Sequence, residues 1–151
     1  QAGFIPATVV FILDVSKGWL PTWLALHYAP ANWIVPLTAA LAVIGHCWPV
    51  FAGFRGGMGL ATANGGMMAG APVAILICYA LLLLLTLIIR HSARASVIAG
   101  ILFAPVLWLV GLRGVLIWIS VAVGLVITLR FTIDWNRKYR ELWLDREKNK
   151  G

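Results

Sequence analysis

Residues 73–89 read VAILICYALLLLLTLII, a stretch of seventeen residues in which only Tyr79 and Thr86 carry a hydroxyl group. A helix of about 17 to 25 such residues spans the hydrocarbon core of a bilayer. Pro72 precedes the stretch, in a position that a helix start tolerates, and Arg90 follows it. The stretch therefore predicts a membrane-spanning helix.

The composition extends this prediction to the whole chain. Of the 151 residues, 62% are hydrophobic and 11% are charged, whereas soluble domains are roughly half apolar and about a quarter charged. This excludes a water-soluble fold. Of the flanking segments, residues 60–71 are too short to cross alone at about 1.5 Å per residue, and residues 4–27 are interrupted by Asp14, Lys17 and Gly18 before Pro21. The other apolar segments are residues 33–54, 95–112 and 115–129.

We therefore predict an all-α fold, a polytopic transmembrane helix bundle of about six hydrophobic segments in residues 1–130. Residues 131–151 are predicted to form a basic amphipathic cytoplasmic tail of the same domain, with apolar side chains at helical spacing among charges. Tryptophans near the segment ends are typical of anchors at the membrane interface. These are Trp19, Trp33, Trp108 and Trp118.

The charge balance indicates an orientation. The net charge is +7, and half of the twelve basic residues lie in the last fifteen positions. Beside membrane spans, such a cluster reflects the cytoplasmic preference of Lys and Arg and does not indicate a nucleic-acid partner. This rule places the tail, residues 90–94 and Arg55 in the cytoplasm, with membrane lipids as partners, and leaves Arg113 outside as the exception. Cys47 and Cys78 lie in apolar runs and predict neither a disulfide nor a zinc site.

Residues 45–62, GHCWPVFAGFRGGMGLAT, carry the strongest local signal for function. Successive glycine N–H groups can converge on an anion, an arginine adds a fork of donors, and the start of a helix adds its positive end. This combination predicts a phosphate-binding loop. The alternative is a tight connection at the membrane surface with Arg55 as an interfacial anchor.

This stretch resembles the second signature of the bacterial acyl-phosphate glycerol-3-phosphate acyltransferases, the PlsY family. That signature reads approximately Gly-His-x-(Phe/Trp)-Pro-Val-Phe-x-x-Phe-Lys-Gly-Gly-Lys-Gly-Val-Ala-Thr, and the chain departs from it at Arg55, Met58 and Leu60. Residues 14–21 are similar to the family's Asp-x-x-Lys-Gly-x-x-Pro element. The resemblance implies a seven-helix plan, of which about six segments are expected here.

The resemblance also implies a reaction. Such enzymes move an acyl group from acyl phosphate to glycerol 3-phosphate, giving lysophosphatidate for phospholipid biosynthesis, with no metal or organic cofactor. His46 is the candidate general base, and its alternative role is that of a packed, hydrogen-bonded core residue. The carried-over residues for the substrate phosphate are Arg55, Gly56, Gly57, Gly59 and Thr62.

Departures from the family pattern support a second hypothesis. Met58 replaces a lysine, and a thioether cannot pair with phosphate. A first signature rich in Ser, Gly and Asn is expected upstream of Gln1, and of the third signature, Arg-His-x-x-Asn followed by a glutamate, only Glu147 matches. The alternative is thus a catalytically degenerate family protein that acts as a structural subunit of a larger membrane complex.

Ionisable side chains within the apolar segments support the site. Asp14 and Lys17 are three residues apart on one helical face, and intramembrane charges are functional candidates by default. The alternative for this pair is an internal ion pair that holds helices together. Asp134 and Asp145 are expected to form solvated ion pairs along the tail helix.

Overall fold

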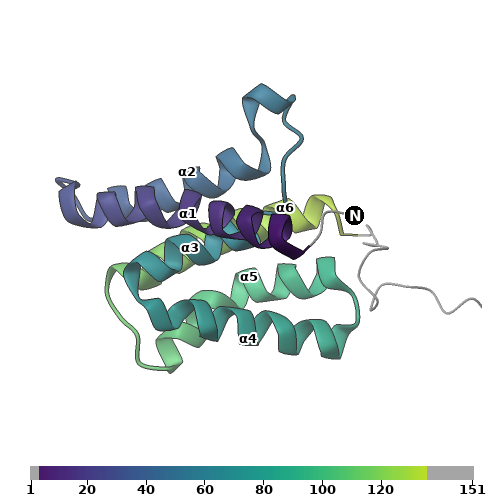
Figure 1. The fold of residues 1–151 in the computed structure, drawn as a ribbon. Helices are drawn as coiled ribbons and strands as arrows, with labels where there is room; N and C mark the ends of the chain where they lie inside the picture. Colours follow the sequence, from purple (N-terminus) through teal and green to yellow (C-terminus); the bar gives the residue numbers. More distant parts are fainter. Residues whose placement is uncertain (1–3, 136–151) are drawn as a thin grey trace, which may run out of the picture.

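The computed structural model describes residues 4–135, and every regular element in that range is helical (Figure 1). Five helices are long and apolar enough to cross a membrane, the second of them counted together with the 3₁₀ turn that follows it. The all-α polytopic prediction is therefore confirmed. The elements are α1 (Phe4–Tyr28), α2 (Ile34–Cys47), the 3₁₀ helix η1 (Val50–Ala52), α3 (Leu60–Gly70), α4 (Pro72–Ile89), α5 (Ser92–Leu109) and α6 (Val115–Ile133).

Helix α1 is continuous, although an interruption near Gly18 was expected. It runs for 25 residues with Pro21 inside it. Gly18 is buried where α1 touches α3, and the hydroxyl of Thr22 donates to the Gly18 carbonyl at 2.8 Å. An unbroken helix keeps backbone groups paired, which hydrocarbon surroundings demand. As a consequence, Trp19 lies within α1 and not at its end.

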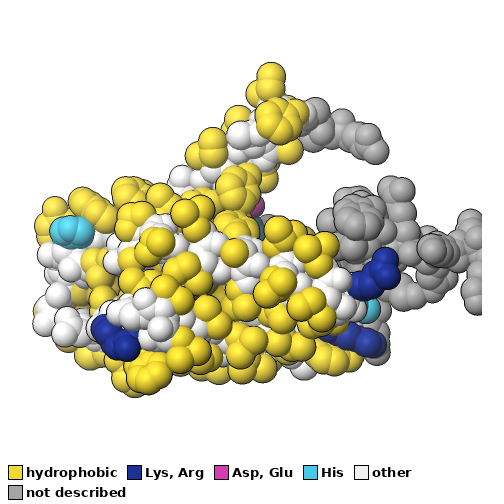
Figure 2. All heavy atoms as spheres, turned by 90° about the horizontal axis from the view of Figure 1, so that it is seen from below, with side chains coloured by type: hydrophobic (Ala, Val, Ile, Leu, Met, Phe, Trp, Pro, Cys, Tyr) yellow, Lys and Arg dark blue, Asp and Glu magenta, His cyan; other side chains and the backbone are white. Residues whose placement is uncertain are grey.

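The connections divide between two ends of the bundle. Figure 1 shows the start of α1, the α4–α5 turn and the end of α6 at one end, which we call the basic end because it carries Arg90, Arg94 and Arg130. The α1–α2, α3–α4 and α5–α6 connections lie at the opposite end, with Arg113. Between these ends, apolar side chains dominate the face in Figure 2, and the basic side chains on that face sit at its two extremes. This pattern is that of a helix bundle with an apolar belt.

Helix α3 is the short element of the bundle. Its eleven residues span about 16 Å, roughly half of a bilayer core. Residues 53–59, which connect η1 to α3 and are here called the glycine loop, stand out from the bundle and return to the buried Gly59 (Figure 1). Residues 136–151, most of the predicted tail, lie outside the described range.

Glycines allow α1 and α3 to approach closely. A Cβ atom on Gly18 would lie 1.9 Å from the carbonyl oxygen of Thr62, and one on Gly65 would lie 2.1 Å from the carbonyl oxygen of Val15. Small residues at helix contacts are typical of membrane bundles, where packing replaces the hydrophobic driving force. The α1–α3 contact therefore determines the direction in which the Asp14 and Lys17 side of α1 points.

We expect Gly65→Ala to lower stability because its methyl group must push the backbones of α1 and α3 apart. The cost should be about 1–3 kcal/mol, typical of overpacking, and a fall of several degrees in melting temperature follows in detergent. The control is Gly45→Ala, also within a helix, because a Cβ there meets nothing within 4 Å. Equal melting temperatures for the two variants would contradict the packing described.

Candidate functional site

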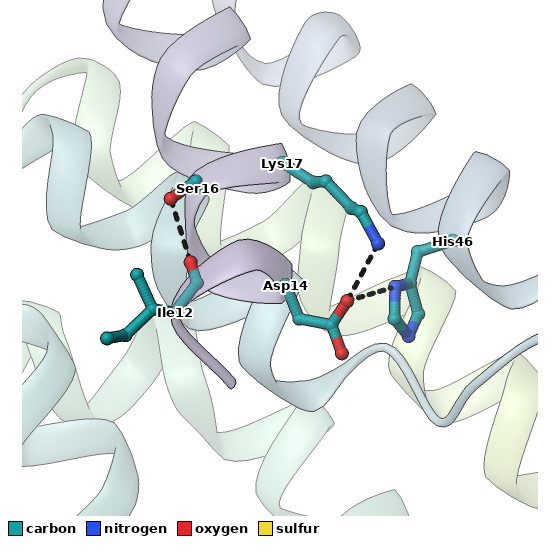
Figure 3. A network of polar contacts seen from close by, with 5 residues as sticks. All are labelled: Ile12, Asp14, Ser16, Lys17 and His46. Atoms are coloured by element: carbon teal, nitrogen blue, oxygen red, sulfur yellow. Dashed lines mark hydrogen bonds and ion pairs between the residues drawn. The ribbon is translucent and has the colours of Figure 1, made fainter. Parts of the chain in front are cut away.

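Asp14 is the centre of a polar network that joins α1 to α2 (Figure 3). Lys17 Nζ donates to Asp14 Oδ1 at 2.9 Å, and His46 Nδ1 lies 3.5 Å from the same oxygen. The side chains of Asp14 and His46 are 19% and 13% exposed, whereas that of Lys17 is 59% exposed. The tautomer with its proton on Nδ1 turns that N–H toward Asp14 and keeps Nε2 as an acceptor.

A hollow of about 500 Å³ opens beside this network. This volume lies within the range of small-molecule sites. Residues 4–135 contain no group of three His, Cys, Asp or Glu side chains that could hold a metal ion. Because Lys17 and His46 line the hollow, it can present a cation and an imidazole to a ligand. Its lining comes from α1, α2, the connection from α2 to η1, and the glycine loop: Lys17, Ala42, Gly45, His46, Pro49 and Gly57.

The glycine loop reaches the site because it lies directly on the end of α2. The N–H of Gly56 donates to the Cys47 carbonyl at 3.1 Å, and the N–H of Gly57 donates to the His46 carbonyl at 3.2 Å. A Cβ on Gly57 would lie 2.2 Å from His46 Nε2, and one on Gly56 would lie 2.1 Å from the His46 carbonyl oxygen. Glycine is the residue that permits this contact.

The hydrogen bonds correct one expectation from the sequence. The amides of Gly56 and Gly57 were expected to converge on an anion, but they pair with carbonyls at the C-terminus of α2, which have no partner further along the helix. The N–H of Arg55 likewise donates to the Ala52 carbonyl. In this conformation, contact with an anion falls to side chains.

The remaining predicted site residues lie in different surroundings. Arg55 is exposed on the glycine loop and does not line the hollow. Gly59, with φ of 80°, precedes α3 and packs against Cys47, where a Cβ would lie 2.6 Å from the sulfur. Thr62 is fully buried, and its hydroxyl has no hydrogen-bond partner within residues 4–135. Glu147 lies outside the described residues.

A second charged pair, which the sequence analysis did not place at the site, packs against the same motif. Arg130 Nη1 donates to Asp134 Oδ2 at 2.7 Å, and the Arg130 guanidinium lies 5.9 Å from the centre of the Trp48 ring. The two side chains are only 13% and 17% exposed, so the expectation of a solvated pair for Asp134 is wrong. The sequence did carry a signal for this pair, because Arg130 and Asp134 are four residues apart at the end of an apolar segment.

The comparisons with known proteins agree on one family. Residues 1–141 match the glycerol-3-phosphate acyltransferase family. The glycerol-3-phosphate acyltransferase of Laribacter hongkongensis is 32% identical over 130 residues, covering 83% of this chain and 64% of the relative. That of Bordetella petrii is 38% identical over 125 residues, with 82% and 58% covered. The chain thus spans about three fifths of the length of these two curated relatives.

A third relative and two solved structures are also similar. The glycerol-3-phosphate acyltransferase of Aquifex aeolicus is 32% identical over 130 residues, with 85% of this chain and 68% of the relative covered. The structure of PlsY (YgiH), an integral membrane glycerol 3-phosphate acyltransferase, in its glycerol 3-phosphate form superimposes with a TM-score of 0.71 at 32% identity, covering 86% of this chain and 66% of that one. The lysophosphatidic acid form gives 0.72, with 86% and 67% covered.

We expect Asp134→Ala to destabilise the protein by about 3 kcal/mol, because it leaves the largely buried Arg130 charge without this partner. The double variant Arg130→Met, Asp134→Leu should recover most of that loss, since it removes both charges together. Thermal unfolding in detergent measures both effects, with Arg113→Gln as the control at an exposed cation. A double variant as unstable as Asp134→Ala would contradict the account of this pair.

Proposed function

The chain belongs to the glycerol-3-phosphate acyltransferase family, and from that membership we propose that it transfers an acyl group from acyl phosphate to glycerol 3-phosphate at the membrane surface. The products are lysophosphatidate and inorganic phosphate. The observation that carries the proposal is the hollow that Lys17, His46 and Gly57 line, with Asp14 in contact with both Lys17 and His46. The relatives bear the enzyme's name, which favours catalysis over the structural-subunit alternative.

Both substrates carry phosphate, so the site must first overcome their mutual repulsion. Lys17 places an ammonium group at the edge of the hollow, and Asp14 holds it there. Arg55 lies two residues before Gly57 in the chain and is exposed, and we propose that it folds over the hollow when a phosphate enters. Its guanidinium then offers a bidentate contact, which Met58 cannot supply.

The other phosphate residues from the family motif act through the backbone in this proposal. Gly56 and Gly57 bring the loop against His46, and Gly59 begins α3. Leu60 opens the first turn of α3. Thr62 belongs to this first turn, and its fully buried position supports a role in fixing the helix start.

The reaction requires a proton acceptor at the attacking hydroxyl. We propose that His46 Nε2 takes this proton while Asp14 keeps the other ring nitrogen protonated. The hydroxyl oxygen bonds to the carbonyl carbon of acyl phosphate, the bond from that carbon to the phosphate oxygen breaks, and its electron pair leaves with phosphate. The imidazolium then returns the proton to the departing phosphate. Each bond and proton is thereby accounted for.

The proposed orientation places the basic end in the cytoplasm of a bacterial cell, within its cytoplasmic membrane. Arg90, Arg94 and Arg130 support this assignment because cytoplasmic ends collect Lys and Arg. The C-terminus, with six further basic residues among the last fifteen, then also lies in the cytoplasm. The phosphate groups of both substrates prefer water, so in this proposal they reach the hollow from the cytoplasmic side.

The activity itself is the first prediction of this proposal. Purified full-length protein in detergent, given acyl phosphate and glycerol 3-phosphate, should form lysophosphatidate, detected by mass spectrometry. Arg55→Ala should lower kcat/KM for glycerol 3-phosphate about a hundredfold, because a charge-assisted bidentate contact is lost. Arg113→Ala, at the opposite end, should leave kcat/KM unchanged. If wild-type protein makes no product, the proposed function is wrong.

A second prediction separates catalysis from simple helix pairing at Asp14. Asp14→Asn should lower kcat about a hundredfold with little change in KM, because His46 loses the carboxylate that fixes its proton. Lys17→Gln should instead raise KM, since it removes a phosphate-binding cation. If Asp14→Asn reduces only the melting temperature and leaves kcat intact, the pair is structural and His46 is not positioned by it.

A further inference from the structure

Arg113 is a cation that neither the orientation nor the proposed reaction explains. It lies at the opposite end of the bundle from the other described arginines of α4–α6. Its Nη1 donates to the carbonyl oxygens of Trp108 and Leu112, and its guanidinium lies 4.7 Å from the centre of the Trp108 ring. The Arg113 side chain is exposed, and these contacts hold it in place. Its Nε and Nη2 have no hydrogen-bond partner within residues 4–135.

An apolar groove opens next to Arg113. It has a volume of about 720 Å³ and lies between α2 and α6, beginning at Asn32 and Gly114, the neighbour of Arg113. The walls are almost entirely apolar, and Trp33 and Trp118 are each 66% exposed along it. The further lining used here is Leu37, Val115, Ala122 and Leu125.

A second hollow extends the groove toward the middle of the bundle. It has a volume of about 160 Å³, lies between α5 and α6, and shares Val121 and Leu125 with the groove. Its α5 wall carries Ile101 and Ala104, and Trp108 follows these at helical spacing on the same face. The apolar path thus begins beside the Trp108–Arg113 pair. From Val115 to Leu125 it follows ten residues of helix, about 15 Å.

We infer that this groove binds one acyl chain of a glycerophospholipid whose phosphate contacts Arg113. A rise of about 15 Å equals half of a bilayer core, the depth that one acyl chain occupies. Asn32 lines the groove and Arg113 directly precedes the lining residue Gly114, so both would meet the headgroup at this end, where exposed tryptophans mark the interface level. The site lies at the opposite end from the catalytic hollow and does not depend on the proposed function.

Native mass spectrometry of the full chain tests this inference, with dioleoyl phosphatidylglycerol as the probe. Wild-type protein should retain one lipid with high occupancy, and Arg113→Gln should weaken its binding about tenfold, as expected for loss of a charge-assisted contact. Arg90→Gln is the matched control, because it removes the same charge from an exposed residue at the basic end. Ala122→Phe, which fills the groove, should prevent retention while the melting temperature confirms a folded protein.

Quenching of tryptophan fluorescence provides a readout that does not depend on the gas phase. Phosphatidylglycerol brominated on its acyl chain should quench wild-type protein more than the Ala122→Phe variant, because Trp33 and Trp118 flank the bound chain. Equal retention by wild type, Arg113→Gln and Ala122→Phe would overturn the inference. So would a two-chain species that Ala122→Phe dissociates, because a second copy would then occupy the groove.

Discussion

The structure depends on the need of every backbone N–H and C=O group for a partner at membrane depth. Helix α3 is too short to cross alone, and the glycine loop that precedes it has no regular hydrogen bonding of its own. The loop meets this need by donating Gly56 and Gly57 N–H groups to the last carbonyls of α2. Because those carbonyls belong to His46 and Cys47, the same bonds that satisfy the backbone place Gly57 against the His46 ring.

Close helix contacts then determine what His46 faces. Gly18 and Gly65 let α1 lie directly on α3, and this contact fixes the rotation of α1 about its axis. Asp14 lies one turn before Gly18 and reaches His46 on α2, while Lys17, beside Gly18, pairs with Asp14. Helix α1 is thus held by α3 on one face while it presents a carboxylate to α2 on another. Glycines that never touch a ligand therefore set the geometry of the hollow.

Much of the fold follows from sequence, because hydropathy reports membrane spans directly. The apolar runs around residues 73–89 predict α4 and its neighbours closely, and residues 45–62 identify the family. The continuity of α1 was missed because Gly18 and Pro21 act as helix breakers in water, whereas lipid and the contact with α3 reverse that preference. The direction of the glycine amides could not be predicted, since the sequence does not reveal that the end of α2 lies beneath them. For Asp134, burial of the pair that it forms with Arg130 was invisible at the level of local charge spacing.

Asp14 shows why an ion pair and a catalytic role need not be alternatives. A carboxylate in apolar surroundings is costly unless other charges and donors meet it. Lys17 meets that requirement from the same helix and His46 from α2, both at a single oxygen. A structural pair alone would be satisfied by Lys17, which is near and exposed to solvent. The additional approach of an imidazole, whose ring lines the hollow together with Lys17, gives the arrangement that the proposed reaction needs, a proton acceptor beside a cation.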